Sequence, residues 1–247
     1  MDLDEVIAKL VDANHILARE QVVDAFGHIS VRHPNRPDRF LLSCSRSPEL
    51  VQPADIMEFT LDGIPVDARG RKPYFERFIH GAIMAVRPEV MSVVHNHSYD
   101  VIPYAVSKTP LRPVFHSAGN LGKVMPVWDI RTRFGATNML VNDIEKGRDM
   151  AQALDDHNVV LMRGHGCTVV GRSIEQAVLS SVYLQVNARL QTTAMMLGGD
   201  VSYLQDDEID VIQTAAANAP GNDRAWEYLL SRTRGHHSGE PRIPSIN

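Results

Sequence analysis

Two histidines separated by a single residue, His95 and His97, follow the apolar run VMSVV and have the type and spacing of metal ligands. In an extended chain, residues i and i+2 point to the same side, so both imidazoles can converge on one cation. Two histidines do not close a metal site, and further ligands must come from elsewhere. His165 is the candidate third ligand, because it follows another apolar run and lies between Gly164 and Gly166, which let backbone come close.

Glu76 is the candidate carboxylate of the same site. We expect a helix over residues 74–87, which puts Glu76 in its first turns and on the same face as His80, four residues later. Three histidines and one carboxylate suit one divalent metal ion with an open catalytic position; zinc is the first choice, and manganese and iron are alternatives. On spacing alone, a structural histidine pair and a simple glycine turn remain alternatives to a metal site.

The elements that must position these residues are predicted from apolar periodicity and from cap and turn residues. We expect strands at 28–32, 40–43, 57–61, 90–95 and 158–162, the last interrupted at 163–166 and resumed at 168–170. We expect helices over 2–20 and 74–87, a helix capped by Asn142, a long helix capped by Ser173 and ended by Gly198, and a terminal helix over 223–234. Short early connections favour a mostly antiparallel or mixed sheet within one α/β domain over residues 1–234, followed by a disordered tail at 235–247.

Composition excludes several classes of protein. The 25 basic and 30 acidic residues give a formal net charge of −5, which argues against nucleic acid or an anionic membrane as a partner. Two cysteines are too few for a disulfide framework, and no window approaches the ~18 apolar residues of a membrane span. Together with an acidic N-terminus, these features predict a cytoplasmic protein. The chain has no GxGxxG and no GxxxxGK[ST] sequence, so we expect no dinucleotide or P-loop site.

Taken together, these motifs resemble the class II aldolase and adducin family. The resemblance is carried, in order, by the segment at 27–32, the Glu76 helix, His95-Asn96-His97-Ser98 and Arg163-Gly164-His165-Gly166. It implies a three-layer α/β/α fold around a central, mainly antiparallel sheet. It also implies one divalent metal held by His95, His97 and His165, with Glu76 as acid or base and as a further metal ligand. The family's cyclic tetramers imply a homotetramer with active sites at subunit boundaries.

The chain departs from the sugar-phosphate enzymes of this family where those enzymes bind phosphate. A pair of serines before the acid is replaced by Tyr74-Phe75, which favours a flat, apolar and aromatic ligand. His28, Arg46 and Arg77 are the gained groups that we expect to bind a substrate carboxylate, because arginine pairs with carboxylates through two parallel hydrogen bonds.

Where the chain departs from the sugar-phosphate enzymes, it resembles the hydroxy-aromatic dicarboxylate decarboxylases of the family, of the pyridine-dicarboxylate and dihydroxyphthalate types. The segments that carry this resemblance are 41–51, 74–81 and 111–116. The implied enzyme is a carboxy-lyase of aromatic compound catabolism that removes a carboxyl ortho to a ring hydroxyl. The ring carbon is protonated before carbon dioxide leaves, and the metal stabilises charge on the ortho oxygen. Glu76 is the expected proton donor, His116 is a second catalytic candidate, and His80 is either a rival acid or a core histidine.

Two other functions remain open at this point. The first is an aldolase, epimerase or dehydratase that acts on a small hydroxy-carbonyl compound. The second is an adducin-like binding protein, which is disfavoured because a binding module has no use for three convergent histidines. The terminal helix, with Trp226 and Tyr228, either reaches a neighbouring subunit or packs on its own.

Overall fold

A computed structural model of the chain describes residues 2–218 and 222–234, so the tail predicted at 235–247 lies outside the described residues. Seven strands form one sheet in the order β3-β2-β1-β4-β7-β6-β5. Neighbouring strands pair antiparallel, except β5 and β6, which are parallel. The strands are β1 (His28–Arg32), β2 (Arg39–Ser43), β3 (Ile56–Thr60), β4 (Ser92–Asn96), β5 (Val127–Trp128), β6 (Val159–Met162) and β7 (Gly166–Gly171).

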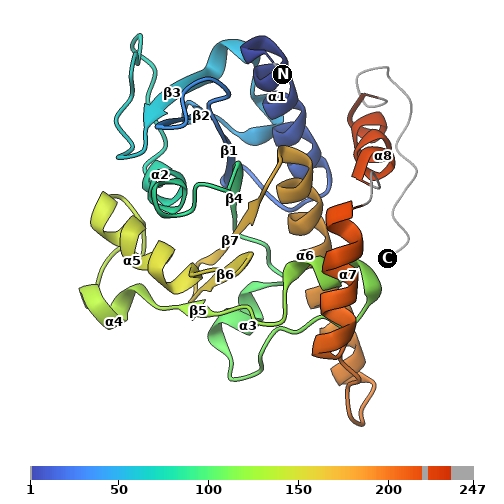
Figure 1. Cartoon of the computed structure of the whole chain (residues 1–247). Coiled ribbons are helices and arrows are strands. Elements are labelled where there is room, and N and C mark those ends of the chain that lie inside the picture. The colour runs from blue at the N-terminus through green and yellow to red at the C-terminus, as the bar shows by residue number, and fades with distance from the viewer. Residues whose placement is uncertain (1, 219–221, 235–247) are drawn as a thin grey trace.

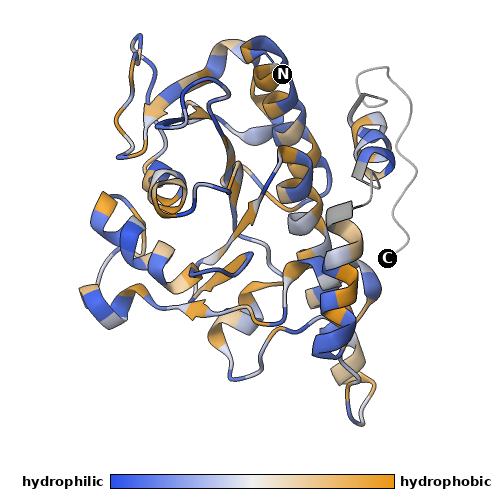
Figure 2. Ribbon diagram, viewed as in Figure 1, coloured by the Kyte–Doolittle hydropathy of each residue, from blue (hydrophilic) through white to orange (hydrophobic). Residues whose placement is uncertain are grey.

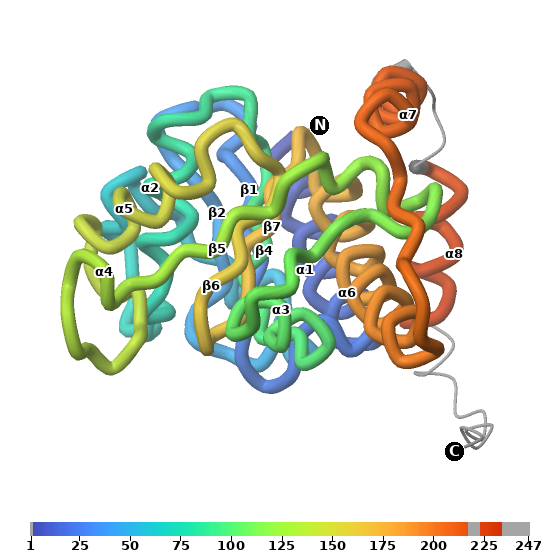
Figure 3. The backbone as a smooth tube through the Cα atoms, turned by 90° about the horizontal axis from the view of Figure 1, so that it is seen from below, coloured from blue at the N-terminus to red at the C-terminus, as the bar shows by residue number. Residues whose placement is uncertain are grey.

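Helices cover both faces of this sheet (Figures 1 and 3). The helices α2 (Arg77–Val86) and α5 (Ile144–Leu154) pack together on one face, and α1 (Leu3–Arg19) and α6 (Ile174–Met196) pack together on the other. This arrangement confirms the predicted α/β/α layers and the mainly antiparallel sheet. The remaining helices are α3 (Ile102–Val106), α4 (Ile130–Phe134), α7 (Asp206–Asn218) and α8 (Asn222–Arg234), with short 3₁₀ turns η1 (Pro48–Leu50), η2 (Pro53–Asp55) and η3 (His116–Leu121).

Alternating strand residues supply a separate hydrophobic core on each face of the sheet. In β4, Val94 belongs to the core under α1 and α6, whereas Val93 belongs to the core under α2 and α5. The helices match this pattern, because polar and apolar residues alternate around α1, as an amphipathic helix requires (Figure 2). The side-chain period of two therefore fixes which strand residues face each helical layer. His95, two residues after Val93, faces the α2 side.

Four details differ from the sequence-based expectations. The helix α2 begins at Arg77, so Glu76 is its N-cap and does not lie in its first turns. Asp143, and not Asn142, caps α5, since its carboxylate accepts from the Lys146 N–H. The segment at 163–166 does not interrupt one strand; it reverses the chain, so that β6 and β7 pair as an antiparallel hairpin. The short elements β5, α3 and α4 and the helix α7 were not predicted.

The terminal helix α8 packs on its own chain. Trp226 and Leu229 belong to the core that α1 and α6 share, while Tyr228 is exposed. No helix among residues 2–218 and 222–234 combines the length and hydropathy needed to cross a bilayer.

Candidate metal centre

The first two histidines lie at the carboxyl-terminal end of the central strand β4, where His95 faces the α2 side of the sheet. His95 is the cross-strand partner of His28 in β1 and of Thr168 in β7. The chain then leaves β4 after Asn96, and His97 lies next to His95 with their Nε2 atoms 3.1 Å apart. The predicted convergence of the two imidazoles on one point is therefore present in the structure.

The β6–β7 hairpin delivers the third histidine to the same point. His165 lies in the turn, and its Nε2 is 3.1 Å from Nε2 of His97. Gly166 is required here, because a Cβ at this position would stand 2.1 Å from the carbonyl oxygen of Asn96. Without a side chain at this position, β7 can approach the end of β4 closely enough for the histidines to meet.

Glu76 completes a cluster of four ligand atoms. Its Oε2 lies 3.5 Å from Nε2 of His95 and 3.4 Å from Nε2 of His165. A tetrahedral zinc ion with ligand distances of about 2.0–2.1 Å would separate its ligand atoms by roughly 3.3–3.4 Å. The measured separations of 3.1 to 3.5 Å match that spacing, and all four atoms lie within 4.8 Å of one another.

The hydrogen bonds around the cluster fit a bound cation. His95 Nδ1 lies 3.1 Å from the Cys167 carbonyl, which can only accept, so the proton of a neutral imidazole is on Nδ1 and its Nε2 carries a lone pair. Such a lone pair 3.1 Å from another imidazole nitrogen needs a proton or a cation between them. Oε1 of Glu76 accepts from the Val141 N–H, which leaves Oε2 toward the histidines. The residues present therefore suit one metal ion.

Burial and mutual contact set the charges in the cluster. Burial, together with His95 and His165, lowers the pKa of His97 to about 4, so this imidazole is neutral near pH 7 and can bind a metal. Burial by itself would raise the pKa of Glu76, but His95 and His165 outweigh it and hold that pKa well below its ordinary value. His97 thus offers a neutral nitrogen and Glu76 an anionic oxygen, two ligand types that divalent cations bind.

The amino-acid sequence is similar to a known domain family and to several named decarboxylases. The Class II Aldolase and Adducin N-terminal domain matches residues 8–192, most of the chain. The chain belongs to this family. Decarboxylase tropJ from Talaromyces stipitatus is 37% identical over 204 residues, which cover 77% of this chain and 77% of that relative. A 3,4-dihydroxyphthalate decarboxylase from Rhodococcus jostii is 25% identical over 94% of this chain and 97% of its own.

A solved structure shows the same fold. The crystal structure of an aldolase II superfamily protein from Pseudomonas syringae superposes with a TM-score of 0.79, at 23% identity, over 95% of this chain and 94% of that chain. The decarboxylase relatives and the family domain identify this class II aldolase family member as an enzyme, a lyase.

Beside the four-residue cluster of this family member, His28 and His80 form a buried pair. Nδ1 of His28 is 2.7 Å from Nε2 of His80, and Nδ1 of His80 is 2.7 Å from Oγ of Ser30. The ring of His28 also lies 4.5 Å from that of Tyr74 and 5.3 Å from that of His95, measured between centroids. His80 is therefore a core histidine that supports His28, and the ring of Tyr74 packs against the ring of His28.

The two predicted arginines have backbone partners. Arg46 donates from Nε to the Leu50 carbonyl at 2.6 Å and pairs with Asp55 at 3.3 Å. Arg77 donates to the Gly63 and Tyr74 carbonyls at 2.6 and 2.9 Å. These bonds tie the guanidiniums to loops around Tyr74, and a role in carboxylate binding stays a prediction.

His116 lies in the opposite layer from Glu76. It is exposed at the start of η3, whose Ala118 and Leu121 belong to the core under α1 and α6. Within one chain, the sheet therefore separates His116 from the helical layer that carries Glu76.

Three residues that support the ligands were not predicted. Val141 and Cys167 act through their backbone, as described above, and the sequence carries no signal for a bond of this kind. Asn96 points to the other face of the sheet, where its Oδ1 accepts from the Ser98 N–H at 3.1 Å and from the Cys167 thiol at 3.2 Å. Its place between His95 and His97 could have marked it as a residue that fixes the turn after β4.

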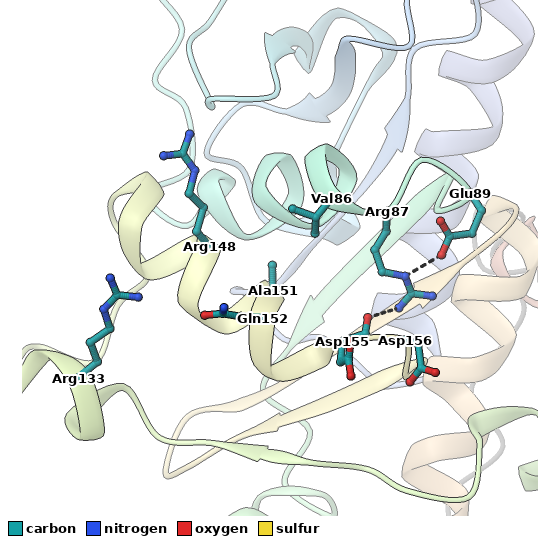
Figure 4. Close-up of a pocket in the computed structure, with 9 residues that line it drawn as sticks. All are labelled: Val86, Arg87, Glu89, Arg133, Arg148, Ala151, Gln152, Asp155 and Asp156. Atoms are coloured by element: carbon teal, nitrogen blue, oxygen red, sulfur yellow. Dashed lines mark hydrogen bonds and ion pairs between the residues drawn. The ribbon is translucent and has the colours of Figure 1, made fainter.

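A separate cavity of about 570 Å³ opens between α2 and α5 (Figure 4). Its arginines are already paired: Arg87 with Glu89 at 2.7 Å, Arg133 with Asp149 at 3.0 Å and Arg148 with Asp62 at 3.2 Å. It contains none of the four residues of the cluster, Glu76, His95, His97 and His165.

Proposed function

We propose that this protein is a divalent-metal-dependent decarboxylase that removes the carboxyl group ortho to a ring hydroxyl of a hydroxy-aromatic or hydroxy-pyridine carboxylate. The observation that carries the proposal is the four-ligand cluster with the His28 and Tyr74 rings beside it. The similarity to tropJ and to 3,4-dihydroxyphthalate decarboxylases supports the reaction. Zinc is the first choice of metal, with manganese and iron as alternatives.

His95, His97 and His165 would hold the metal, with Glu76 as the fourth ligand of the substrate-free enzyme. A divalent ion in this cluster would act as a Lewis acid that stabilises negative charge on the substrate oxygen beside the departing carboxyl. The rings of His28 and Tyr74 would pack against the substrate ring and exclude water from it. Arg46 or Arg77 would orient a second carboxylate.

Glu76 would move the proton. Because its pKa is held low, Glu76 is ionised near neutral pH and must accept a proton before it can donate one. It takes the proton of the ring hydroxyl and delivers it to the ring carbon that bears the carboxylate. The bond from that carbon to the carboxylate then breaks, carbon dioxide leaves, and the bonding electrons restore the aromatic ring. The ring oxygen regains its proton from water.

The enzyme would work as a homotetramer with active sites shared between subunits. Three large exposed aromatic residues lie within two positions of site residues: Phe26 near His28, Phe75 beside Glu76 and Tyr99 near His97. Contiguous exposed apolar patches mark surfaces that a partner covers, and we propose that these three side chains lie in one such patch at the subunit boundary. In such an assembly, His116 of one subunit would serve the metal centre of its neighbour.

Carbon dioxide release tests the reaction. Purified protein loaded with zinc, manganese or iron is incubated with 3,4-dihydroxyphthalate and 2-hydroxybenzoate, with phthalate as the control that lacks a hydroxyl. We expect release only from substrates with a hydroxyl ortho to a carboxyl. Efficient cleavage of L-fuculose 1-phosphate, with no carbon dioxide from any carboxylate, would instead favour the aldolase alternative.

A further inference from the structure

The loop between α4 and α5 contains a residue in a strained backbone conformation, Met139. Its φ angle is 66°, in the left-handed region that residues other than glycine, asparagine and aspartate rarely adopt. Its side chain is half-buried. Such strain costs free energy and persists only where the surrounding structure enforces it, and strained residues of this kind cluster at functional sites. The contacts of Met139 therefore show what its conformation could serve.

The backbone of Met139 turns the chain just before the residue that bonds Glu76. The N–H of Met139 donates to the Thr137 hydroxyl at 2.9 Å, which tightens the turn. Two residues later, the N–H of the fully buried Val141 donates to Oε1 of Glu76 at 2.9 Å. An extended conformation at Met139 would send the following residues in another direction, so the position of the Val141 N–H depends on the left-handed one.

The side chain of Met139 reaches the turn that carries His165. A Cβ built on Gly164 would stand 3.3 Å from Cε of Met139, so the methionine methyl packs beside Gly164. In the part of the chain that the structure describes, the buried Nδ1 of His165 has no hydrogen-bond partner, whereas Nδ1 of His95 lies 3.1 Å from the Cys167 carbonyl. The placement of the His165 ring therefore depends on the packing of its turn rather than on a bond to Nδ1.

We propose that Met139 is a positioning residue that sets the separation of Glu76 and His165 in the proposed metal site. Its left-handed backbone directs the Val141 N–H to Glu76, and its side chain supports the turn at Gly164. One loop thereby acts on two ligands from distant segments, whose Oε2 and Nε2 atoms lie 3.4 Å apart. The inference rests on the metal binding of the proposed function and is independent of the substrate.

Substitutions at Met139 separate the backbone from the side chain. Met139→Gly and Met139→Ala both remove the contact with Gly164, but glycine adopts a positive φ without strain and alanine does not. We therefore expect Met139→Gly to be the more stable of the two in denaturant titrations of the metal-free proteins. In zinc competition with a chelator, we expect both to bind zinc roughly 10- to 100-fold more weakly than the wild type, as is typical when a residue that orients metal ligands is changed.

Met139→Leu is the conservative comparison. Leucine has nearly the volume of methionine, so it should keep the contact with Gly164 and most of the zinc affinity. A merely structural residue would behave differently, because its loss would lower the unfolding midpoint and leave the zinc affinity of the folded protein unchanged. Wild-type zinc affinity in Met139→Gly would overturn the proposal.

The absorption spectrum of the cobalt-loaded proteins reports the ligand geometry without any substrate. The visible bands of Co²⁺ depend on the positions of the ligand atoms around the ion. We expect these bands to shift in Met139→Gly and to keep their wild-type positions in Met139→Leu. Unchanged bands in Met139→Gly would show that the ligands do not depend on Met139, and would count against the proposal as directly as unchanged zinc affinity.

Asp155→Gly is the matched control. Asp155 also has a positive φ, of 49°, but it is exposed and lies at the end of α5 that is far from the Met139 loop. Zinc affinity and the cobalt spectrum should stay as in the wild type; an equal loss in Asp155→Gly would remove the specific role of Met139. If Met139→Gly weakens zinc binding as expected while the wild type releases no carbon dioxide, the decarboxylase function fails and the role of Met139 stands.

Discussion

The backbone N–H of Val141 donates to Oε1 of Glu76 at 2.9 Å, across 65 residues of sequence. This bond turns the second carboxylate oxygen, Oε2, toward His95 and His165. Glu76 stands at the N-cap of α2 but makes no capping bond with its side chain, so its carboxylate is free to face the histidine cluster. The N–H of Val141 thereby orients the Glu76 carboxylate, which is the proposed proton carrier.

Replacing Glu76 by Gln should abolish proton transfer without loss of metal. Three histidines remain to hold the ion, and the amide oxygen can still accept from Val141. Because positioned proton transfer contributes about 10²–10⁴-fold, we expect kcat to fall by that factor with little change in substrate affinity. Steady-state kinetics and metal analysis measure both effects, with Glu145→Gln on the exposed face of α5 as the control. If kcat stays within a few-fold while His116→Ala is inactive, the proton donor is misassigned.

Replacing His95 by Ala should remove most of the metal and all activity from a protein that stays folded. The cluster then keeps only His97, His165 and Glu76, and none of these is oriented by the Cys167 carbonyl as His95 is. Elemental analysis and circular dichroism report metal content and fold. His157→Ala, a change of a half-exposed histidine outside the cluster, should leave both unchanged. Full metal content in His95→Ala would remove His95 from the ligand set.

Replacing Gly166 by Ala should displace the third ligand. The new Cβ would stand 2.1 Å from the backbone carbonyl of Asn96, so β7 must move away from β4. We expect a loss of about 1–3 kcal/mol in the free energy of unfolding and a weaker affinity for zinc. Denaturant titration and zinc competition measure these. At Gly70 the added Cβ meets open space, so Gly70→Ala should keep the zinc affinity. Wild-type zinc affinity in Gly166→Ala would show that close strand approach does not position His165.

The ion pair between Lys9 in α1 and Glu175 in α6 should make stability depend on pH. Burial would raise the pKa of Glu175, but its bond to Lys9 outweighs this, and the net pKa is lowered. The pair therefore stabilises the fold above the unfolded pKa of about 4.3, and this contribution disappears as pH falls through the lower folded pKa.

Lys9→Met should consequently cost about 0.5–1 kcal/mol near pH 7, and this cost should shrink in acid. Thermal unfolding between pH 3 and 7 measures it. The exposed pair of Arg69 and Asp67 provides the control, since Arg69→Met should leave Tm unchanged. A cost for Lys9→Met that is equal at pH 3 and pH 7 would contradict the linkage.

Mixing two inactive variants tests whether subunits share active sites. If His116 acts on the metal centre of a neighbour, mixed tetramers of His95→Ala and His116→Ala contain some sites with both residues intact. Random mixing should then restore about a quarter of wild-type activity. Light scattering should show tetramers before and after mixing. An active monomer, or no recovery in properly mixed tetramers, would rule out a shared site.

Residue types and their local spacing were enough to predict the candidate ligands and an α/β domain with a mostly antiparallel or mixed sheet, and the family resemblance added the three layers. His95 and His97 converge because the side-chain period of a strand is two, and that rule needs no knowledge of other segments. Apolar periodicity likewise located the main strands and helices, since each buries one face on the sheet. These features are local; the structure confirms the fold class and brings the two histidines together, and their role as metal ligands stays a prediction.

How these parts meet depends on contacts between segments that are far apart in the sequence. The turn at 163–166 could continue a strand or reverse it, and the pairing of β6 with β7 settles this. The orientation of Glu76 depends on Val141, and the partners of His80 depend on the register of β1 against β4. Backbone N–H and carbonyl groups are the same in every residue other than proline, so their long-range bonds leave no trace in residue type. For that reason, the sequence could supply the candidate metal ligands but not the hydrogen bonds that orient them.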